Sequence, residues 1–213
     1  MPTSLLTESI PFQENPLYET IISDLLDQGY SICDTFLDDD LTSNLREELH
    51  HLFHQSELKK AAIGNKTNES IEKNIRGDYI QWINERHPNS TEKKFFNTIN
   101  DFKTYLNKTC FMGLLHQEFH YAVYPQGTFY KRHIDTFQND DRRKLSMVCY
   151  LNDESWSLSY GGELVLYPEG KEQVAIHPLP GRVVIFESQI LEHEVKEVLR
   201  SERYSITGWL KTR

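Results

Sequence analysis

The segment from Tyr124 to Asp135 holds the residues best suited to chemistry. His133 and Asp135 lie two positions apart, directly after a strand-like run, and side chains at i and i+2 of an extended backbone point the same way. They can therefore bind one metal ion from one side, with His193 as the natural third ligand from a later segment. Two imidazoles and one carboxylate that leave open positions opposite them indicate non-haem Fe(II), which must also hold a cosubstrate and O2.

A second feature is Arg203, which opens a strand-like run that ends at Trp209. Its planar guanidinium suits two-point recognition of a carboxylate, so the sequence indicates an anionic ligand close to the metal. A plain salt bridge with Glu192, Glu194 or Glu202 is the alternative interpretation.

The order of these features along the chain strengthens the metal-site interpretation. A His-x-Asp pair alone is weak evidence in a chain with nine histidines and 32 acidic residues. Here the pair belongs to an ordered series of turns and polar residues: Tyr124-Pro-Gln-Gly127, Gly161-Gly162, Pro180-Gly181, His193 and Arg203. A structural zinc site is disfavoured because such sites are closed by four protein ligands.

Length and charge limit the classes of protein to consider. A chain of 213 residues fits one domain that buries a core without disulfides. A net charge of −9 argues against a sequence-independent grip on nucleic acid, which depends on clustered Lys and Arg. Basic residues nevertheless flank the metal pair: Lys131, Arg132, Arg142, Arg143 and Lys144.

Cysteine usage and the N-terminus indicate the compartment. Cys33, Cys110 and Cys149 are far apart and form no C-x-x-C pair, so we expect three small buried hydrophobic residues in a reducing environment. Residues 1–16 show no basic patch followed by an apolar run, and no segment approaches the roughly 20 apolar residues of a membrane span. The sequence predicts a cytoplasmic protein with no membrane partner.

The first half of the chain reads as mainly helical. Apolar residues at helical spacing predict one helix ending at Gly29, a second capped by Asp39 or Asp40, and a third after the turn at Pro88. The third helix carries an apolar stripe made of Phe95, Phe96, Ile99, Phe102, Leu106 and Phe111. Strands are expected at 30–34 and 75–82, and a polar loop at 61–70. Three histidines at the end of the second helix, at 50, 51 and 54, are expected to be surface residues.

From residue 116 the spacing of apolar residues changes from helical to every second position, as in β-strands. Short strands are predicted at 118–124, 128–132, 144–152, 163–167, 173–177, 182–186, 193–198 and 204–211. This density of strands predicts a closed or double-sheet architecture. We therefore expect one α+β domain over 1–213, in which 1–115 is mainly helical support packed on one sheet and 116–213 is a catalytic core. That core should be a double-stranded β-helix, which is a jelly roll of cupin type.

The motifs of this chain resemble a known family, the 2-oxoglutarate- and Fe(II)-dependent dioxygenases. The likeness is to the hypoxia-inducible-factor type of prolyl hydroxylase and its bacterial relatives, and it runs from about Leu17 to Leu210. The residues that carry it are Ile75-Arg-Gly-Asp-Tyr-Ile-Gln-Trp82, Tyr124-Pro, Gly127, His133-Ile-Asp135, Tyr150-Leu-Asn152, Gly161-Gly162, Tyr167-Pro-Glu-Gly-Lys171, His193-Glu-Val195 and Arg203-Tyr-Ser-Ile-Thr-Gly-Trp209.

The resemblance implies a role for each matching residue. It assigns Fe(II) to His133, Asp135 and His193, and the distal carboxylate of 2-oxoglutarate to Arg203 and Tyr150. The remaining implied positions are Tyr124 near the iron end of the cosubstrate, Thr207 and Trp209 in the pocket wall, and Arg76, Asp78 and Arg143 at the substrate entrance. Ordinary core packing is the alternative for the three aromatic residues among them.

The resemblance also implies a reaction and a partner. O2 and 2-oxoglutarate are consumed, succinate and CO2 are released, ascorbate acts as reductant, and a prolyl residue in a protein loop is hydroxylated at C4. The implied partner is elongation factor Tu, or a ribosomal protein or transcription factor.

Three alternatives stay open. The first is a hydroxylase of a small molecule or free amino acid, whose carboxylate Arg132 and Arg143 would read. The second is a non-catalytic cupin-type sensor of the metal or of 2-oxoglutarate. The third, a demethylase of alkylated nucleic acid, is disfavoured by the acidic charge and by Trp209, which stands where that group has a second arginine.

Overall fold

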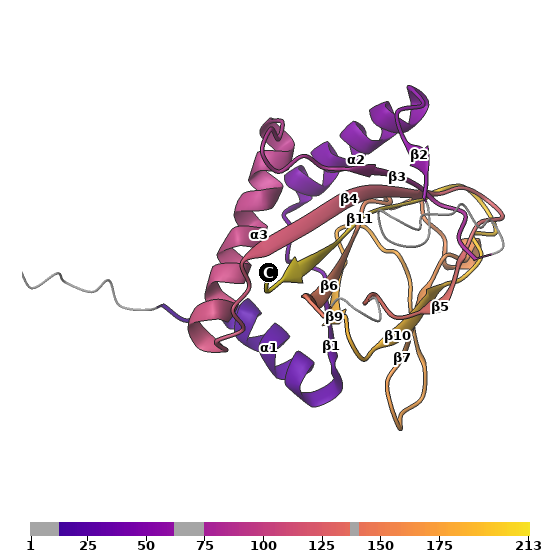
Figure 1. Cartoon of the computed structure of the whole chain (residues 1–213). Helices are drawn as coiled ribbons and strands as arrows, with labels where there is room; N and C mark the ends of the chain where they lie inside the picture. The colour runs from indigo at the N-terminus through magenta and orange to yellow at the C-terminus, as the bar shows by residue number, and fades with distance from the viewer. Residues whose placement is uncertain (1–12, 62–74, 137–140) are drawn as a thin grey trace, which may run out of the picture.

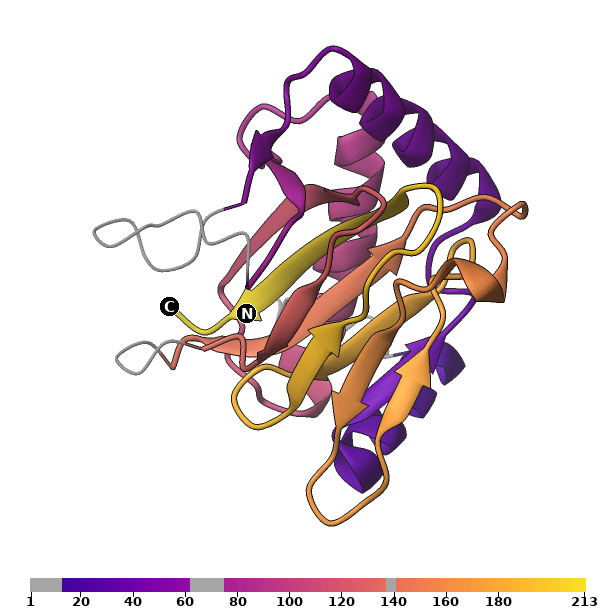
Figure 2. The same ribbon diagram turned by 90° about the vertical axis from the view of Figure 1, so that its right-hand side faces the viewer.

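The structure is a computed structural model that describes residues 13–61, 75–136 and 141–213. Three helices cover one side of a seven-stranded antiparallel sheet, and a four-stranded antiparallel sheet lies on its other side (Figure 1). After a quarter turn the smaller sheet stands nearest the viewer, in front of the larger one (Figure 2). This arrangement confirms the predicted α+β jelly roll with N-terminal helices packed on one sheet.

The helices begin and end at the signals expected from the sequence. They are α1 (Pro16–Gln28), α2 (Asp39–His54) and α3 (Ser90–Thr109). Gly29 ends α1 with φ +82, a backbone conformation that costs glycine little. Asn89 and Glu92 form a capping box at the start of α3, so each satisfies a backbone N–H that the helix leaves unpaired.

Three predictions from the first half of the sequence are wrong. Asp38, rather than Asp39 or Asp40, caps α2, because its Oδ1 accepts from the Leu41 N–H at 2.7 Å. Phe111 does not continue the stripe of α3, since the helix ends at Thr109 and Phe111 follows in a left-handed conformation with 87% exposure. Cys110 is the C-cap of that helix and is exposed, whereas the other two cysteines are buried.

Eleven strands are described, divided between the two sheets. They are β1 (Tyr30–Cys33), β2 (Lys59–Lys60), β3 (Tyr79–Trp82), β4 (His116–Tyr124), β5 (Tyr130–His133), β6 (Arg143–Tyr150), β7 (Leu164–Tyr167), β8 (Val174–Ile176), β9 (Val183–Glu187), β10 (Glu192–Val195) and β11 (Arg203–Lys211). The larger sheet has the order β1-β9-β6-β11-β4-β3-β2, and the smaller has the order β5-β10-β7-β8.

The first half of the chain supplies β1, β2 and β3 to the larger sheet, in addition to the helices. The strand expected over 75–82 is shorter than predicted, because Arg76 makes an isolated bridge to Tyr130 and pairing with β4 starts at Tyr79. The polar loop expected at 61–70 lies outside the described residues except for its first position.

Alternate side chains of β4 point into two different hydrophobic cores. Phe119, Tyr121 and Val123 belong to the core shared with the helices. Ala122 and Tyr124 belong to the core between the sheets. The functional side chains of β4 and β11 are therefore held on the face that looks toward the smaller sheet. None of the described helices is long and apolar enough to cross a membrane.

Candidate active site

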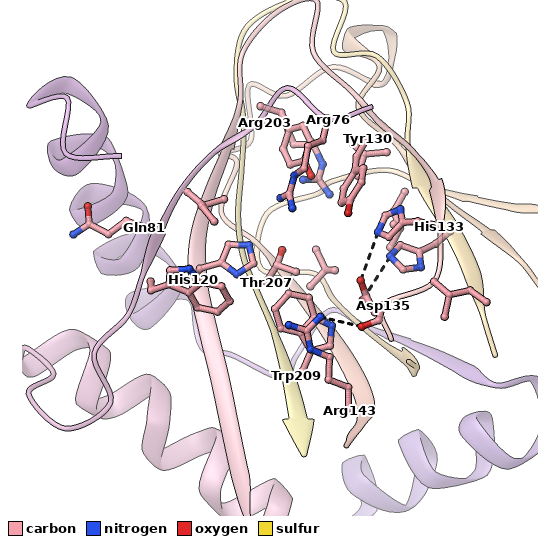
Figure 3. A pocket seen from close by; sticks show the side chains of 18 of the residues that line it. Arg76, Gln81, His120, Tyr130, His133, Asp135, Arg143, Arg203, Thr207 and Trp209 are labelled. Carbon is pink, nitrogen blue, oxygen red and sulfur yellow. Dashed lines mark hydrogen bonds and ion pairs between the residues drawn. The ribbon is translucent and has the colours of Figure 1, made fainter. Parts of the chain in front are cut away.

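The three expected metal ligands meet between the two sheets. His193 of β10 stands directly opposite His133 of β5 in the antiparallel register, and Asp135 follows two residues after β5. Nε2 of His133 lies 3.5 Å from Asp135 Oδ1, and Nε2 of His193 lies 3.6 Å from Asp135 Oδ2 (Figure 3). One ligand atom from each residue lies within 4.8 Å of the other two, the only such group among the described residues.

Hydrogen bonds orient each ligand toward a common point. Nδ1 of His133 lies 2.7 Å from the Lys131 carbonyl, and Nδ1 of His193 lies 3.2 Å from the Leu191 carbonyl. A proton on each Nδ1 leaves both Nε2 lone pairs for a metal. Ser146 donates to Asp135 Oδ2 at 2.7 Å, which fixes the carboxylate as well.

The protonation states also suit a divalent cation. Burial alone would raise the pKa of Asp135, but the adjacent His193 and His133 and the Ser146 hydrogen bond bring the pKa well below its usual range. Burial lowers the pKa of His193 to about 4. An ionised carboxylate and a neutral imidazole are the forms that bind a metal ion, so the donor set fits Fe(II) at neutral pH.

A cavity of about 940 Å³ opens in front of the three ligands. Its lining includes Arg203, Tyr124, Thr207 and Trp209, so four of the predicted cosubstrate residues share one space with the metal ligands. Tyr150 does not line the cavity; it is fully buried with its ring 4.9 Å from the Arg203 guanidinium. The site therefore combines metal ligands with a buried cation.

Arg203 has no carboxylate partner among the described residues. It is 1% exposed, and its guanidinium lies 5.0 Å from the Tyr124 ring and donates only to Ser205 Oγ, at 3.3 Å. Its Nε and the Tyr150 hydroxyl are both buried without a hydrogen-bond partner. A buried charge normally requires a counterion, so this end of the cavity fits the carboxylate of a ligand such as 2-oxoglutarate.

The alternative salt bridges of Arg203 are not formed. Glu192 binds Arg132, Glu194 binds Lys196 at 2.5 Å, and Glu202 accepts from the Tyr204 hydroxyl at 2.6 Å. Each glutamate therefore already has a partner elsewhere.

Gly162 explains part of the Gly161-Gly162 motif. Its φ is +70, and a Cβ built there would lie 3.1 Å from Arg203 Cδ and 3.2 Å from a methyl group of Val198. A side chain would strain the backbone and crowd the arginine. The glycine thus lets Arg203 approach the loop.

Of the three predicted entrance residues, the two arginines line the cavity and Asp78 does not. Arg76 lines the cavity and makes two contacts with Asp78, whose own side chain is buried and outside the cavity. Arg143 lines the cavity, but it donates to Glu118 at 2.9 Å and stacks 3.5 Å from the Trp209 ring. These two arginines are thus fixed by neighbouring carboxylates.

Arg132 does not line the cavity. It pairs with Glu192 and stacks 3.8 Å from the Tyr167 ring. This position does not favour the alternative in which Arg132 reads the carboxylate of a small substrate. The histidines at the end of α2 form no metal group in the described chain, and the His50 ring packs 4.5 Å from that of Tyr204.

His120 is a cavity residue that the sequence analysis missed. It is 4% exposed, lies opposite Thr207 in the β4–β11 register, and packs 4.9 Å from the Trp82 ring and 5.6 Å from the Trp209 ring. Its Nδ1 is buried without a partner. The sequence did contain a signal, because His120 lies four positions before Tyr124 and so on the same face of one strand.

The buried imidazole of His120 should make stability depend on pH. Burial lowers the pKa of His120 to about 4, and the charge of Arg76 acts in the same direction. In the unfolded chain the imidazole takes up a proton already below about pH 6.5. Protonation therefore favours the unfolded state, and the free energy of unfolding falls as the pH drops from 6.5 to 4.

We expect His120→Phe to remove this dependence. The loss of stability between pH 7 and pH 4 should become smaller by about 3 kcal/mol, as measured by urea unfolding of both proteins at each pH. His120→Gln should behave like His120→Phe, because both lack a titrating ring. Equal losses in the wild type and both variants would show that His120 titrates normally.

This chain is similar to one described protein family and to several solved structures. Residues 119–211 match the family described as the 2OG-Fe(II) oxygenase superfamily. A prolyl-4-hydroxylase of Pseudomonas putida is 34% identical with a TM-score of 0.83, over 93% of this chain and 100% of that one. A prolyl hydroxylase from Trichoplax adhaerens, solved with a peptide fragment of the hypoxia inducible factor oxygen degradation domain, is 27% identical with a TM-score of 0.82, over 92% of this chain and 89% of that one.

Curated relatives show the same likeness in sequence. Egl nine homolog 1 of Rattus norvegicus is 30% identical over 201 residues, which cover 90% of this chain and 57% of that protein. Its Homo sapiens counterpart is 29% identical over 197 residues, which cover 90% of this chain and 46% of that protein. The chain thus spans about half the length of these relatives.

Proposed function

Because this chain belongs to the prolyl hydroxylase family of the 2-oxoglutarate- and Fe(II)-dependent oxygenases, we propose that it hydroxylates a prolyl residue within a protein substrate. The family and the enzyme class predicted from the sequence are confirmed: the chain is a 2-oxoglutarate-dependent dioxygenase of the prolyl hydroxylase type. One observation carries the proposal furthest. A single cavity holds a His-Asp-His metal group and a buried arginine with no carboxylate partner among the described residues.

The available donor atoms support a role for each of the ligand-binding residues. His133, Asp135 and His193 would hold Fe(II), and Arg203 with Tyr150 would bind the distal carboxylate of 2-oxoglutarate through their unpartnered atoms. When bound, Fe(II) would supply the site at which O2 oxidises both reactants, with one oxygen atom passing to 2-oxoglutarate as it is split into succinate and CO2 and the other passing to the C–H bond that is hydroxylated. Ascorbate remains the reductant that we expect to sustain activity.

The residues of the chain orient the reactants and exclude water. Tyr124 and Thr207 line the cavity beside Arg203, and burial raises the pKa of Tyr124 well above its usual value. The phenol therefore stays protonated and can donate a hydrogen bond to a bound oxygen. Trp209 and Trp82 supply aromatic wall on the His120 side, against which an apolar pyrrolidine ring can pack.

A protein substrate is favoured over a free amino acid by the state of the cationic side chains. A free amino acid would require a second cation to read its α-carboxylate. Arg143 already contacts Glu118, Arg76 already contacts Asp78, and Arg132 lies outside the cavity. The other two cations that line the cavity beside Arg203, Lys59 and Lys60, are exposed residues of β2. A prolyl residue inside a peptide carries no such charge. The Trichoplax relative was solved with a peptide fragment, which supports the same choice.

The partner follows from the resemblance noted in the sequence. We propose a cytoplasmic protein with an exposed proline-containing loop, with elongation factor Tu as the first candidate and a ribosomal protein or transcription factor as the next. Hydroxylation is expected at C4 of the ring. A non-catalytic sensor would bind the same ligands without releasing succinate above the uncoupled background, so turnover separates the two.

The substrate can be identified directly. The purified enzyme is incubated with Fe(II), 2-oxoglutarate, ascorbate and lysate from a strain lacking the gene, and peptides are searched by mass spectrometry for the gain of one oxygen atom. We expect a modified prolyl peptide that is absent when Asp135→Ala replaces the wild type. The proposal fails if no protein is oxidised while a metabolite extract strongly stimulates succinate release.

A further inference from the structure

Tyr130 connects the metal site to a segment far away in the sequence. Its ring stacks on His133 with centroids 3.7 Å apart and an interplanar angle of 18°. The guanidinium of Arg76 lies 4.4 Å from the same ring. Figure 3 shows Tyr130 between Arg76 and His133. Both neighbours therefore restrict the tilt of the tyrosine, which in turn restricts the metal ligand.

Asp78 holds the guanidinium of Arg76 in place. Its Oδ1 accepts from Arg76 Nε at 2.8 Å and its Oδ2 accepts from Nη2 at 2.5 Å. The Asp78 side chain has no exposed surface, and that of Arg76 is 13% exposed. A two-point contact between a planar guanidinium and a carboxylate holds the arginine in one orientation, so its position over Tyr130 is well defined.

The backbone joins the same two segments. Arg76 and Tyr130 form an isolated antiparallel bridge, the Lys131 N–H donates to the Ile75 carbonyl at 2.8 Å, and the Gly77 N–H donates to the Phe129 carbonyl at 3.0 Å. A Cβ built on Gly77 would lie 2.7 Å from that of Thr128. Residues 75–78 can thus lie close against β5 only because position 77 has no side chain.

His133 needs such support more than the other ligands do. It lies on β5, the edge strand of the smaller sheet, and the β5–β10 pairing has a register irregularity between His193 and Val195. Its side chain is 18% exposed, compared with 6% for His193 and 9% for Asp135. His193 also packs against Phe186, with centroids 4.7 Å apart. Side-chain burial therefore constrains His133 less than its partners.

We propose that Asp78, Arg76 and Tyr130 form a brace that positions His133 for metal binding. The inference rests on the proposed function, in which His133 is a metal ligand. It assigns Arg76 and Asp78 a task beyond shaping the substrate entrance: they are positioning residues that act on the metal through Tyr130. Removing the brace lets the imidazole tilt away from the shared point, so the metal binds more weakly even when no substrate is present.

Metal affinity, measured without turnover, tests the brace. Co(II) is titrated into the metal-free full-length protein under anaerobic conditions, and both the dissociation constant and the visible absorption of bound Co(II) are recorded. Changes in residues that orient metal ligands typically weaken binding by about 10–100-fold. We expect Tyr130→Leu to weaken Co(II) binding within this range and to alter the visible spectrum. Asp78→Asn should have the same effect in smaller measure, and Tyr130→Phe, which keeps the stacked ring, should bind like the wild type.

Asp34→Asn is the matched control. Asp34 also makes a two-point contact with an arginine, Arg182, at 2.7 and 2.9 Å, although its side chain is 57% exposed, and neither residue lines the cavity. It should leave the Co(II) affinity unchanged, and unfolding curves of all variants separate general instability from a local effect.

Two results would overturn the brace. If Tyr130→Leu and Asp78→Asn both bind Co(II) like the wild type, the two segments do not position His133. If Asp34→Asn weakens binding as much as Asp78→Asn, the effect comes from stability alone. A wrong metal assignment, on which the proposed function rests, is recognised separately. Co(II) would then bind Asp135→Ala as tightly as the wild type, and this result would remove the premise of the brace as well.

Discussion

Asp135→Ala should abolish the conversion of 2-oxoglutarate to succinate. The carboxylate is the only anionic ligand of the three, and it is buried with two imidazoles directed at it. Without it, two neutral imidazoles must hold a divalent cation alone, and the charge of the metal is no longer offset inside the cavity. Succinate release with saturating Fe(II) and 2-oxoglutarate measures the effect, and His193→Ala should match it.

Ser146→Ala is the graded control for this result. The serine donates to Asp135 Oδ2 at 2.7 Å and lies 2.9 Å from Ser188 Oγ, so its loss loosens the carboxylate without removing a ligand. We expect measurable turnover with a higher Fe(II) requirement. Normal succinate release by Asp135→Ala or His193→Ala with iron present would show that the metal group is assigned wrongly.

Arg203→Ala should raise the apparent KM for 2-oxoglutarate about ten-fold or more. A hydrogen bond to a charged group contributes about 1.5–3 kcal/mol, and each 1.4 kcal/mol changes a binding constant about ten-fold. Because Arg203 has no carboxylate partner in the described chain, a bound 2-oxoglutarate would supply it. Initial rates at varied 2-oxoglutarate concentration give the value.

Arg203→Lys distinguishes charge from geometry. Lysine keeps the positive charge but presents a single ammonium in place of the planar fork, so we expect a KM between those of the wild type and Arg203→Ala. The Co(II) affinity of both variants should stay close to that of the wild type, because Arg203 is not a metal ligand. An unchanged KM in Arg203→Ala would move the cosubstrate site to another part of the molecule.

Local patterns in the sequence were sufficient to predict the three helices and most of the strands, although not β2. The period of two in β4 places Tyr124 and the missed His120 on one face, and the strand spacing leads to two sheets. Turn and cap residues such as Gly29 and Asn89 act locally, which is why the end of α1 and the start of α3 were predicted well. Phe111 was assigned wrongly because helical spacing continues past the point where the backbone stops being helical.

Non-local pairings could not be predicted from the residues alone. The register that sets His193 opposite His133 depends on how β10 meets β5, and a shift of one residue would turn the imidazole to the other face. The same holds for the bridge between Arg76 and Tyr130. The residue types of the site were therefore visible in the sequence, whereas the contacts that orient them were not.

Isotopic labelling shows whether the oxygen atom added to a prolyl residue comes from O2. The wild-type enzyme is incubated with Fe(II), 2-oxoglutarate and lysate from a strain lacking the gene under an atmosphere of isotopically heavy O2. We expect one heavy oxygen atom on C4 of a prolyl residue in one protein loop, and none with Asp135→Ala. Oxygen derived from water, oxidation only at residues other than proline, or equal labelling by Asp135→Ala would contradict it.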